Sequence, residues 1–237
     1  AFSGCSGLKG SLKIGNSIKE IKTFTFYKCK EFKGELTLGE NIEKIEKEAF
    51  RNFSKLSGNL NIPESVTSID DYAFFGCSNL IGSLKISESM KFIGNSAFSN
   101  CTSFSELVIS NSITEISNNT FSYCSGFKGS LIIPESIELI SENAFAGCSG
   151  FTELYISGSV LEIKDNAFIN TNFIKIHFNG IFDINCSSSI GFSKNQIIYI
   201  TEKYKNKTFC TFKIKRPTSL LPPKKISIET RNIEINL

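Results

Sequence analysis

Short segments in which apolar and polar residues alternate return at regular intervals along the first three quarters of the chain. In one of them, Leu84 and Ile86 alternate with the polar residues Ser83 and Lys85. A period of two is typical of a strand that buries one face. A second apolar pair, with two polar residues between its members, follows in most of these units. We therefore expect one half-buried strand in each unit, followed by a second pair of apolar residues that faces the same core.

The units are marked by an Ala-Phe or Thr-Phe pair, and successive pairs stand 23 or 24 residues apart. The pairs begin at Ala1, Thr25, Ala49, Ala73, Ala97, Thr120, Ala144 and Ala167. One unit has too few apolar positions to close a core, so the units must stack and bury a continuous column of like residues. The repeat predicts a mostly β solenoid with one short strand of a parallel sheet in each coil. We expect the Ala-Phe-x-x-Cys segment to form a short helical or 3₁₀ turn on the outer side.

The full unit, L-x-I-P-x-S-I-x-x-I-x-x-x-A-F-x-x-C, resembles the BspA-like, treponemal-type leucine-rich repeat. The resemblance covers residues 1 to about 178, and the variant at Cys124–Leu131 is similar to versions found in mucosal protozoa such as trichomonads. It implies a leucine-rich-repeat solenoid of the horseshoe class on a cell-surface or secreted protein that adheres to host cells, matrix proteins or other microbes. It implies no catalytic residue and no cofactor.

The domain organisation follows from where the repeat ends. We expect eight coils in residues 1–178, a C-terminal cap in 179–215, and a Pro/Lys-containing linker with a strand-like end in 216–237. Ala1 lies inside a repeat, so we expect the chain to be part of a longer one. No run of about 18 apolar residues, the length that a membrane helix needs, occurs.

Charge and composition argue against several classes of function. Residues 1–202 carry 17 Lys and Arg against 21 Asp and Glu, whereas residues 203–237 carry 9 against 2. A nucleic-acid-binding fold would normally be basic over its folded part, so we expect no nucleic-acid partner. The basic tail is either a solvated linker or a segment beside a membrane anchor outside this chain. The single histidine and the lack of known catalytic motifs predict no enzyme and no metal site.

The eight cysteines fall into two groups. Six share one slot of the repeat that Phe53 and Thr171 fill in other units, so we expect buried free thiols there: Cys5, Cys29, Cys77, Cys101, Cys124 and Cys148. Cys186 and Cys210 lie outside the repeat and form a candidate disulfide, with two further buried thiols as the alternative. A disulfide would favour an extracellular setting.

The outward strand positions offer the candidate binding surface. One position per coil is polar in the first half of the chain and then becomes apolar or aromatic at Val108, Ile132, Tyr155 and His177. Adjacent strands would bring these four together as an exposed patch of the kind that often binds a protein. The alternatives are plain β-propensity or cover by the C-terminal segment. His177 has no nucleophile partner in the pattern, so we interpret it as a contact residue.

Three functions remain open from the sequence. The first is a surface or secreted adhesin whose partner is a host-surface or matrix protein. The second is an intracellular scaffold for protein–protein interaction. The third is a structural protein that self-associates by stacking coils end to end.

Overall fold

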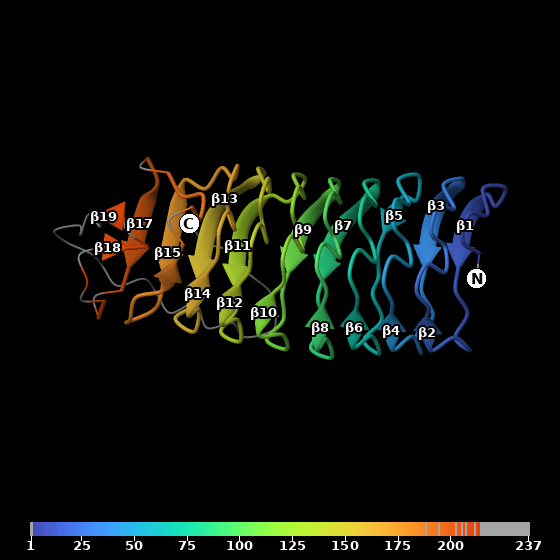
Figure 1. The fold of residues 1–237 in the computed structure, drawn as a ribbon, viewed down its shortest axis with the longest axis horizontal. Helices are drawn as coiled ribbons and strands as arrows, with labels where there is room; N and C mark the ends of the chain where they lie inside the picture. The colour runs from blue at the N-terminus through green and yellow to red at the C-terminus, as the bar shows by residue number, and fades with distance from the viewer. Residues whose placement is uncertain are drawn as a thin grey trace, which may run out of the picture.

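The computed structural model shows a chain wound into coils that stack side by side along one axis (Figure 1). It describes residues 2–187, 189–193, 195–201, 203, 204, 206, 208–210, 212 and 213. The predicted linker and strand-like end, residues 216–237, lie outside the described residues. No helix occurs among the described residues, and so none that could cross a membrane.

The first extended segment of each coil forms the long-strand row. Its members are β1 (Gly10–Lys13), β3 (Phe32–Thr37), β5 (Gly58–Asn59), β7 (Leu80–Lys85), β9 (Phe104–Val108), β11 (Gly129–Ile133), β13 (Phe151–Ile156), β15 (Lys175–Phe178) and β17 (Ile197–Ile200). All pairing within this row is parallel. The hydrogen-bonded sheets are β1-β3, β5-β7-β9 and β11-β13-β15-β17.

The second extended segment of each coil forms the short-strand row on the opposite edge of the coil (Figure 1). Its members are β2 (Glu20–Ile21), β4 (Lys44–Ile45), β6 (Ser68–Ile69), β8 (Phe92–Ile93), β10 (Glu115–Ile116), β12 (Leu139–Ile140), β14 (Glu162–Ile163) and β16 (Asn185–Cys186). They pair in parallel as two sheets, β2-β4-β6-β8 and β10-β12-β14-β16. Most coils therefore carry two strands, one more than the repeat predicts, because the last residue of the second inward pair, such as Ile116, lies on a strand of its own.

The core is a stack of aromatic rings that runs through the coils. The Phe of each Ala-Phe or Thr-Phe pair lies on that of the next coil, with ring centroids 5.1–5.9 Å apart and planes nearly parallel. Rungs of leucine lie beside the stack, since Leu84 pairs with Leu107 and Leu131 pairs with Leu154 in the strand register. Each core Phe or Leu therefore packs on the equivalent residue of the next coil, as the repeat predicts.

The outer segment is built from tight turns, not from the predicted helical or 3₁₀ turn. The residue before each described Ala-Phe or Thr-Phe pair has a left-handed backbone, with φ near +55° at Tyr72, Ser96 and Asn119. A second left-handed residue follows the Phe by two positions, as at Asn100 and Gly76. A right-handed helix cannot pass through left-handed residues, so the segment is limited to separate turns.

Five of the six repeat cysteines are buried free thiols, and Cys5 is half-buried. The thiol of Cys101 donates a hydrogen bond to the carbonyl oxygen of Phe74 in the preceding coil, at 3.1 Å. Cys29, Cys77, Cys124 and Cys148 make the same contact with the preceding coil. This slot therefore suits a small residue that can both pack and donate a hydrogen bond.

The coil architecture continues past residue 178, the end of the predicted repeat. β16 pairs with β14, β17 pairs with β15, and the ring of Phe192 stacks on Phe168 at 5.4 Å. After this ninth coil, β18 (Thr208–Phe209) and β19 (Phe212–Lys213) form an antiparallel hairpin. Phe209 packs on Phe178 at 4.8 Å and is fully buried. We propose that residues 179–215 act as the cap, with a ninth coil as their first part.

Candidate functional site

The strand register brings three of the four predicted patch residues into one line. Ile132 on β11 stands opposite Tyr155 on β13, and Tyr155 stands opposite His177 on β15. The line continues to Tyr199 on β17, a residue that the repeat pattern does not predict to be part of the patch. We call Ile132, Tyr155, His177 and Tyr199 the aromatic row. Val108, the fourth predicted residue, is exposed on β9, across the break between two sheets of the long-strand row.

The three rings of the aromatic row form a parallel stack on the outer face of the sheet. The centroids of Tyr155 and His177 are 4.3 Å apart, and those of His177 and Tyr199 are 4.8 Å apart. The planes differ by 3° and 8°. The stack holds each ring in place before any partner arrives, so little side-chain entropy is lost on binding.

Exposed aliphatic side chains extend the aromatic row on both sides. Val108 is exposed beyond Ile132, the N-terminal member of the row, and Ile197 is exposed beside Tyr199. The same outward position in the first four coils carries Lys13, Thr37, Asn61 and Lys85. At this outward position the apolar side chains are therefore confined to the second half of the row, although Ile81, at another position on β7, is also exposed.

A charged pair lies next to the rings. Lys175 Nζ is 2.8 Å from Glu153 Oε1, and the Tyr155 hydroxyl donates to Glu153 Oε2 at 2.9 Å. The Lys175 ammonium lowers the pKa of Glu153, and burial raises the pKa of Tyr155 to about 12. Both groups of the pair are therefore charged near neutral pH, while Tyr155 keeps its proton. This pair fixes the position of the first ring of the stack.

His177 lies in the middle of the ring stack, between Tyr155 and Tyr199. Burial between the two tyrosines lowers the pKa of its imidazole, which is neutral at pH 7, and its Nε2 atom is buried without a hydrogen-bond partner. General base catalysis needs a nucleophile within hydrogen-bond reach of the imidazole. The groups beside the ring on its own and neighbouring strands are Tyr155, Tyr199, Lys175 and Glu153. The arrangement supports binding rather than proton transfer.

The two cysteines outside the repeat are brought together. The structure joins Cys186 on β16 to Cys210, with a Cα–Cα distance of 5.1 Å. The bond ties the hairpin of the cap to the short-strand row. The Tyr204 hydroxyl strengthens this attachment, because its single proton lies between two acceptors, the carboxylate of Asp183 and the carbonyl oxygen of Thr208.

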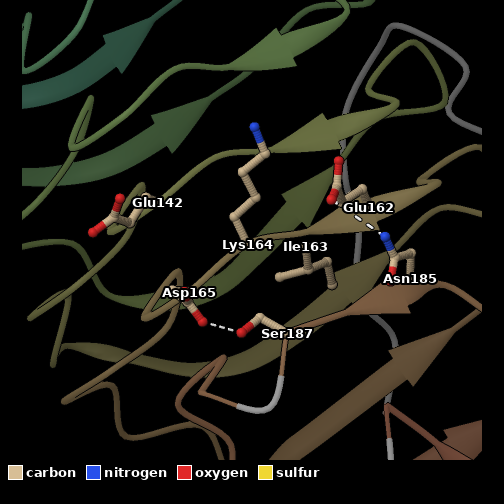
Figure 2. A pocket seen from close by; sticks show the side chains of 7 residues that line it. All are labelled: Glu142, Glu162, Ile163, Lys164, Asp165, Asn185 and Ser187. Carbon is tan, nitrogen blue, oxygen red and sulfur yellow. Dashed lines mark hydrogen bonds between the residues drawn. The ribbon is translucent and has the colours of Figure 1, made fainter.

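The hollows on the surface are shallow and polar. A pocket of about 240 Å³ lies on the short-strand row, lined by Glu142, Glu162, Ile163, Lys164, Asp165, Asn185 and Ser187 (Figure 2). Its carboxylates point in different directions. Glu162 accepts a hydrogen bond from Asn185, and Asp165 accepts one from Ser187. In the part of the chain that the structure describes, no three His, Cys, Asp or Glu side chains gather as a metal site.

Parallel strands at a spacing of 23 or 24 residues, over a core of stacked Phe and Leu, define a leucine-rich-repeat solenoid. This chain belongs to the BspA-type leucine-rich repeat family, since the model of that repeat region matches in six copies over residues 1–128, 80–198 and 129–228. Leucine-rich-repeat solenoids are protein-interaction folds and are generally not enzymes.

Two solved structures share the fold. A leucine-rich repeat protein from Bacteroides ovatus matches at a TM-score of 0.65 and 21% identity, over 85% of this chain and 54% of its own. A leucine rich cell surface protein from Faecalibacterium prausnitzii matches at 0.50 and 24% identity, over 75% of this chain and 61% of its own. The chain thus spans less than two thirds of either protein. No curated protein matches it significantly.

Proposed function

We propose that this chain is the protein-binding part of a cell-surface or secreted adhesion protein, and that the aromatic row is its contact surface. The partner is a protein of a host cell, of the extracellular matrix or of another microbe. The observation that supports this contact surface most directly is the stack of Tyr155, His177 and Tyr199 on the outer face of the sheet. Aromatic side chains held rigidly at the centre of a surface are typical of binding hot spots.

Two observations support an extracellular setting. One of the structurally similar proteins is described as a cell surface protein. The pairing of Cys186 with Cys210 fits an oxidising compartment, because such bonds rarely persist in the cytosol. The alternative, an intracellular scaffold on the same solenoid, would use the same surface without the bond.

The patch is tested by a double substitution on its exposed face. We expect Ile132→Ser with Tyr155→Ser to weaken binding to its partner at least tenfold, as loss of a hot spot costs more than about 1.4 kcal/mol. Binding is measured on fixed epithelial cells and on a panel of purified extracellular-matrix proteins. The fold should survive, because neither side chain belongs to the buried core.

The matched control lies in the same outward column, three to five coils earlier. Thr37→Ser with Asn61→Ser changes exposed polar side chains of the long-strand row and should leave binding unchanged. Equal loss of binding in both double variants would place the contact elsewhere on the sheet. Unchanged binding in the first variant would remove the aromatic row from the proposal.

A further inference from the structure

The turns that link each short strand to the next long strand change in charge along the solenoid. The segment before β1, residues 2–9, and the first two linking turns, residues 22–31 and 46–57, contain seven Lys and Arg against three Glu. The five later linking turns, up to β15, contain two Lys against four Asp and Glu. We call the first three segments, together with Lys33 at the start of β3, the basic edge. It lies in the first coils, drawn in blue in Figure 1, within a body that is acidic as a whole.

Every acidic side chain of the basic edge is held in an ion pair. The pairs are Lys22 with Glu46, Arg51 with Glu48, and Lys55 with Glu31, at N–O distances of 2.6–3.0 Å. The remaining cations of the basic edge are exposed and form no ion pair with any described residue: Lys9, Lys28, Lys30, Lys33 and Lys47. Five positive charges of this edge are therefore left uncompensated.

One group of these cations surrounds Glu31. The hydrogen bond from Lys55 lowers the pKa of the Glu31 carboxyl, and the charges of Lys33 and Lys9 lower it further. The two free lysines therefore lie beside this carboxylate, although they come from different coils. One negative charge faces three positive ones, so the group keeps a net positive charge.

The second group lies on the turn of residues 22–31 and on the turn beside it. The Lys30 N–H donates to the Lys28 carbonyl oxygen at 3.0 Å, and the Phe24 N–H donates to the Lys47 carbonyl oxygen at 3.0 Å. The ring of Phe24, which is 40% exposed, packs edge to face with Tyr27 at 5.4 Å. Lys28 Nζ lies 5.1 Å from the centroid of the Tyr27 ring. The free cations are thus arranged around two rings on the outside of the turns.

This arrangement fits a polyanion whose charges lie along a flexible chain. The centre of a protein interface is usually apolar and depleted of lysine, whereas free lysines occupy the centre of this surface. Lysine is a point charge without the planar fork of arginine, so it accepts anionic groups from many directions. Binding of single-stranded nucleic acid needs open aromatic faces for its bases, and Lys28 covers a face of Tyr27.

We propose that the basic edge binds a sulfated, anionic polysaccharide. The proposal rests on the cell-surface or secreted setting proposed above, because such polysaccharides lie outside cells. The five free ammonium groups lie against sulfate and carboxylate groups of one sugar chain, and its counterions are released on binding. The sugar chain runs across successive turns, which are spaced by about 4.8 Å, as neighbouring strands are. This surface is separate from the aromatic row, which lies on β11–β17.

The test is surface plasmon resonance of the full chain on immobilised heparin, a sulfated polysaccharide. We expect binding at low salt, a Kd that rises with salt, and no binding to heparin from which the sulfates have been removed. The triple variant Lys28→Gln, Lys30→Gln and Lys33→Gln should raise the Kd at least about tenfold and make it less dependent on salt, because three of the five ionic contacts are lost.

The matched control is the triple variant Lys85→Gln, Lys91→Gln and Lys164→Gln. These lysines are exposed in later coils and form no ion pair with a described residue, so the variant changes the net charge equally and should bind heparin like the wild type. Both triple variants should melt at the wild-type temperature, because the changed side chains are exposed. The variant Ile132→Ser with Tyr155→Ser should also keep its affinity for heparin, which separates this surface from the protein contact.

Three results would overturn the proposal. The first is failure of the wild-type chain to bind heparin at low salt. The second is an equal loss of affinity in the two triple variants, which would assign the attraction to net charge alone. The third is a Kd for single-stranded DNA as low as that for heparin, which would contradict a polysaccharide as the partner.

Discussion

Replacing Phe98 with alanine lowers the free energy of unfolding by about 3–5 kcal/mol, which is the usual cost of emptying a buried Phe site. The ring is fully buried and lies between Phe74 at 5.4 Å and Phe121 at 5.9 Å, near the middle of the stack. Because each coil contacts only its neighbours, the gap also weakens the coupling between the two halves of the solenoid. Urea unfolding followed by circular dichroism should show a lower midpoint and a broader transition.

Phe92→Ala is the control for this substitution. It removes the same side chain from the preceding coil, where the ring is half exposed on β8. Surface changes of this kind usually alter stability by about 0.5 kcal/mol or less. Equal stability of the Phe98→Ala and Phe92→Ala proteins would show that the stacked column does not hold the coils together.

The protein loses stability steeply above pH 9. Burial raises the pKa of Cys77 and of Cys124 to about 12, and it raises the pKa of Cys101 and Cys148 well above 9. Below pH 9 these thiols are protonated in both the folded and the unfolded chain, so their contribution to the free energy of unfolding is fully present. Above it the unfolded chain releases these protons while the folded chain keeps them. The free energy of unfolding then falls by about 1.4 kcal/mol per pH unit for each thiol, or about 5 kcal/mol for the four.

The change in the free energy of unfolding with pH is measured by urea unfolding between pH 8 and pH 10.5. Reductant is present so that the Cys186–Cys210 bond is open throughout. The double variant Cys77→Val with Cys124→Val provides the comparison, because valine fills a similar volume and does not titrate. We expect its slope against pH to be about half of the wild-type thiol contribution. Identical slopes in the two proteins would mean that these thiols are accessible to water in the folded state.

The sequence predicts the coils well because every coil repeats the same packing problem. The alternation around Leu84 and Ile86 and the spacing of the Phe residues recur often enough to define the strands and the core. The left-handed turns were missed, although a signal was available. Asn or Gly stands at many of these positions, such as Asn100 and Gly76, and these residues adopt positive φ most readily.

The repeat pattern does not predict the ninth coil, because the Ala-Phe or Thr-Phe pair that marks the other units is changed in it. Gly191 stands where other coils have Ala or Thr, and its φ is +98°. A Cβ atom there would lie 2.3 Å from the Ile169 backbone nitrogen, so this position requires glycine. The Ala-Phe signature therefore disappears while the packing of Phe192 persists. Tyr199 was lost from the predicted patch for the same reason.

The sequence pattern also does not predict where the long-strand row divides into separate hydrogen-bonded sheets. The long-strand row divides between β9 and β11, and this break separates Val108 from the aromatic row. Leu107 and Leu131 remain in one core across it. Side-chain periodicity reports which residues face the core, and it does not report whether two neighbouring backbones exchange hydrogen bonds.

The central claim is that coil stacking places His177 between two tyrosine rings on an exposed face. The chain has a single histidine, so its imidazole gives one set of signals in a proton NMR spectrum. We expect the Hε1 resonance to lie upfield of that of free histidine, to titrate with a lowered pKa, and to move downfield in Tyr199→Leu. A resonance at the free-histidine position, with an ordinary pKa and no response to that substitution, would contradict the account.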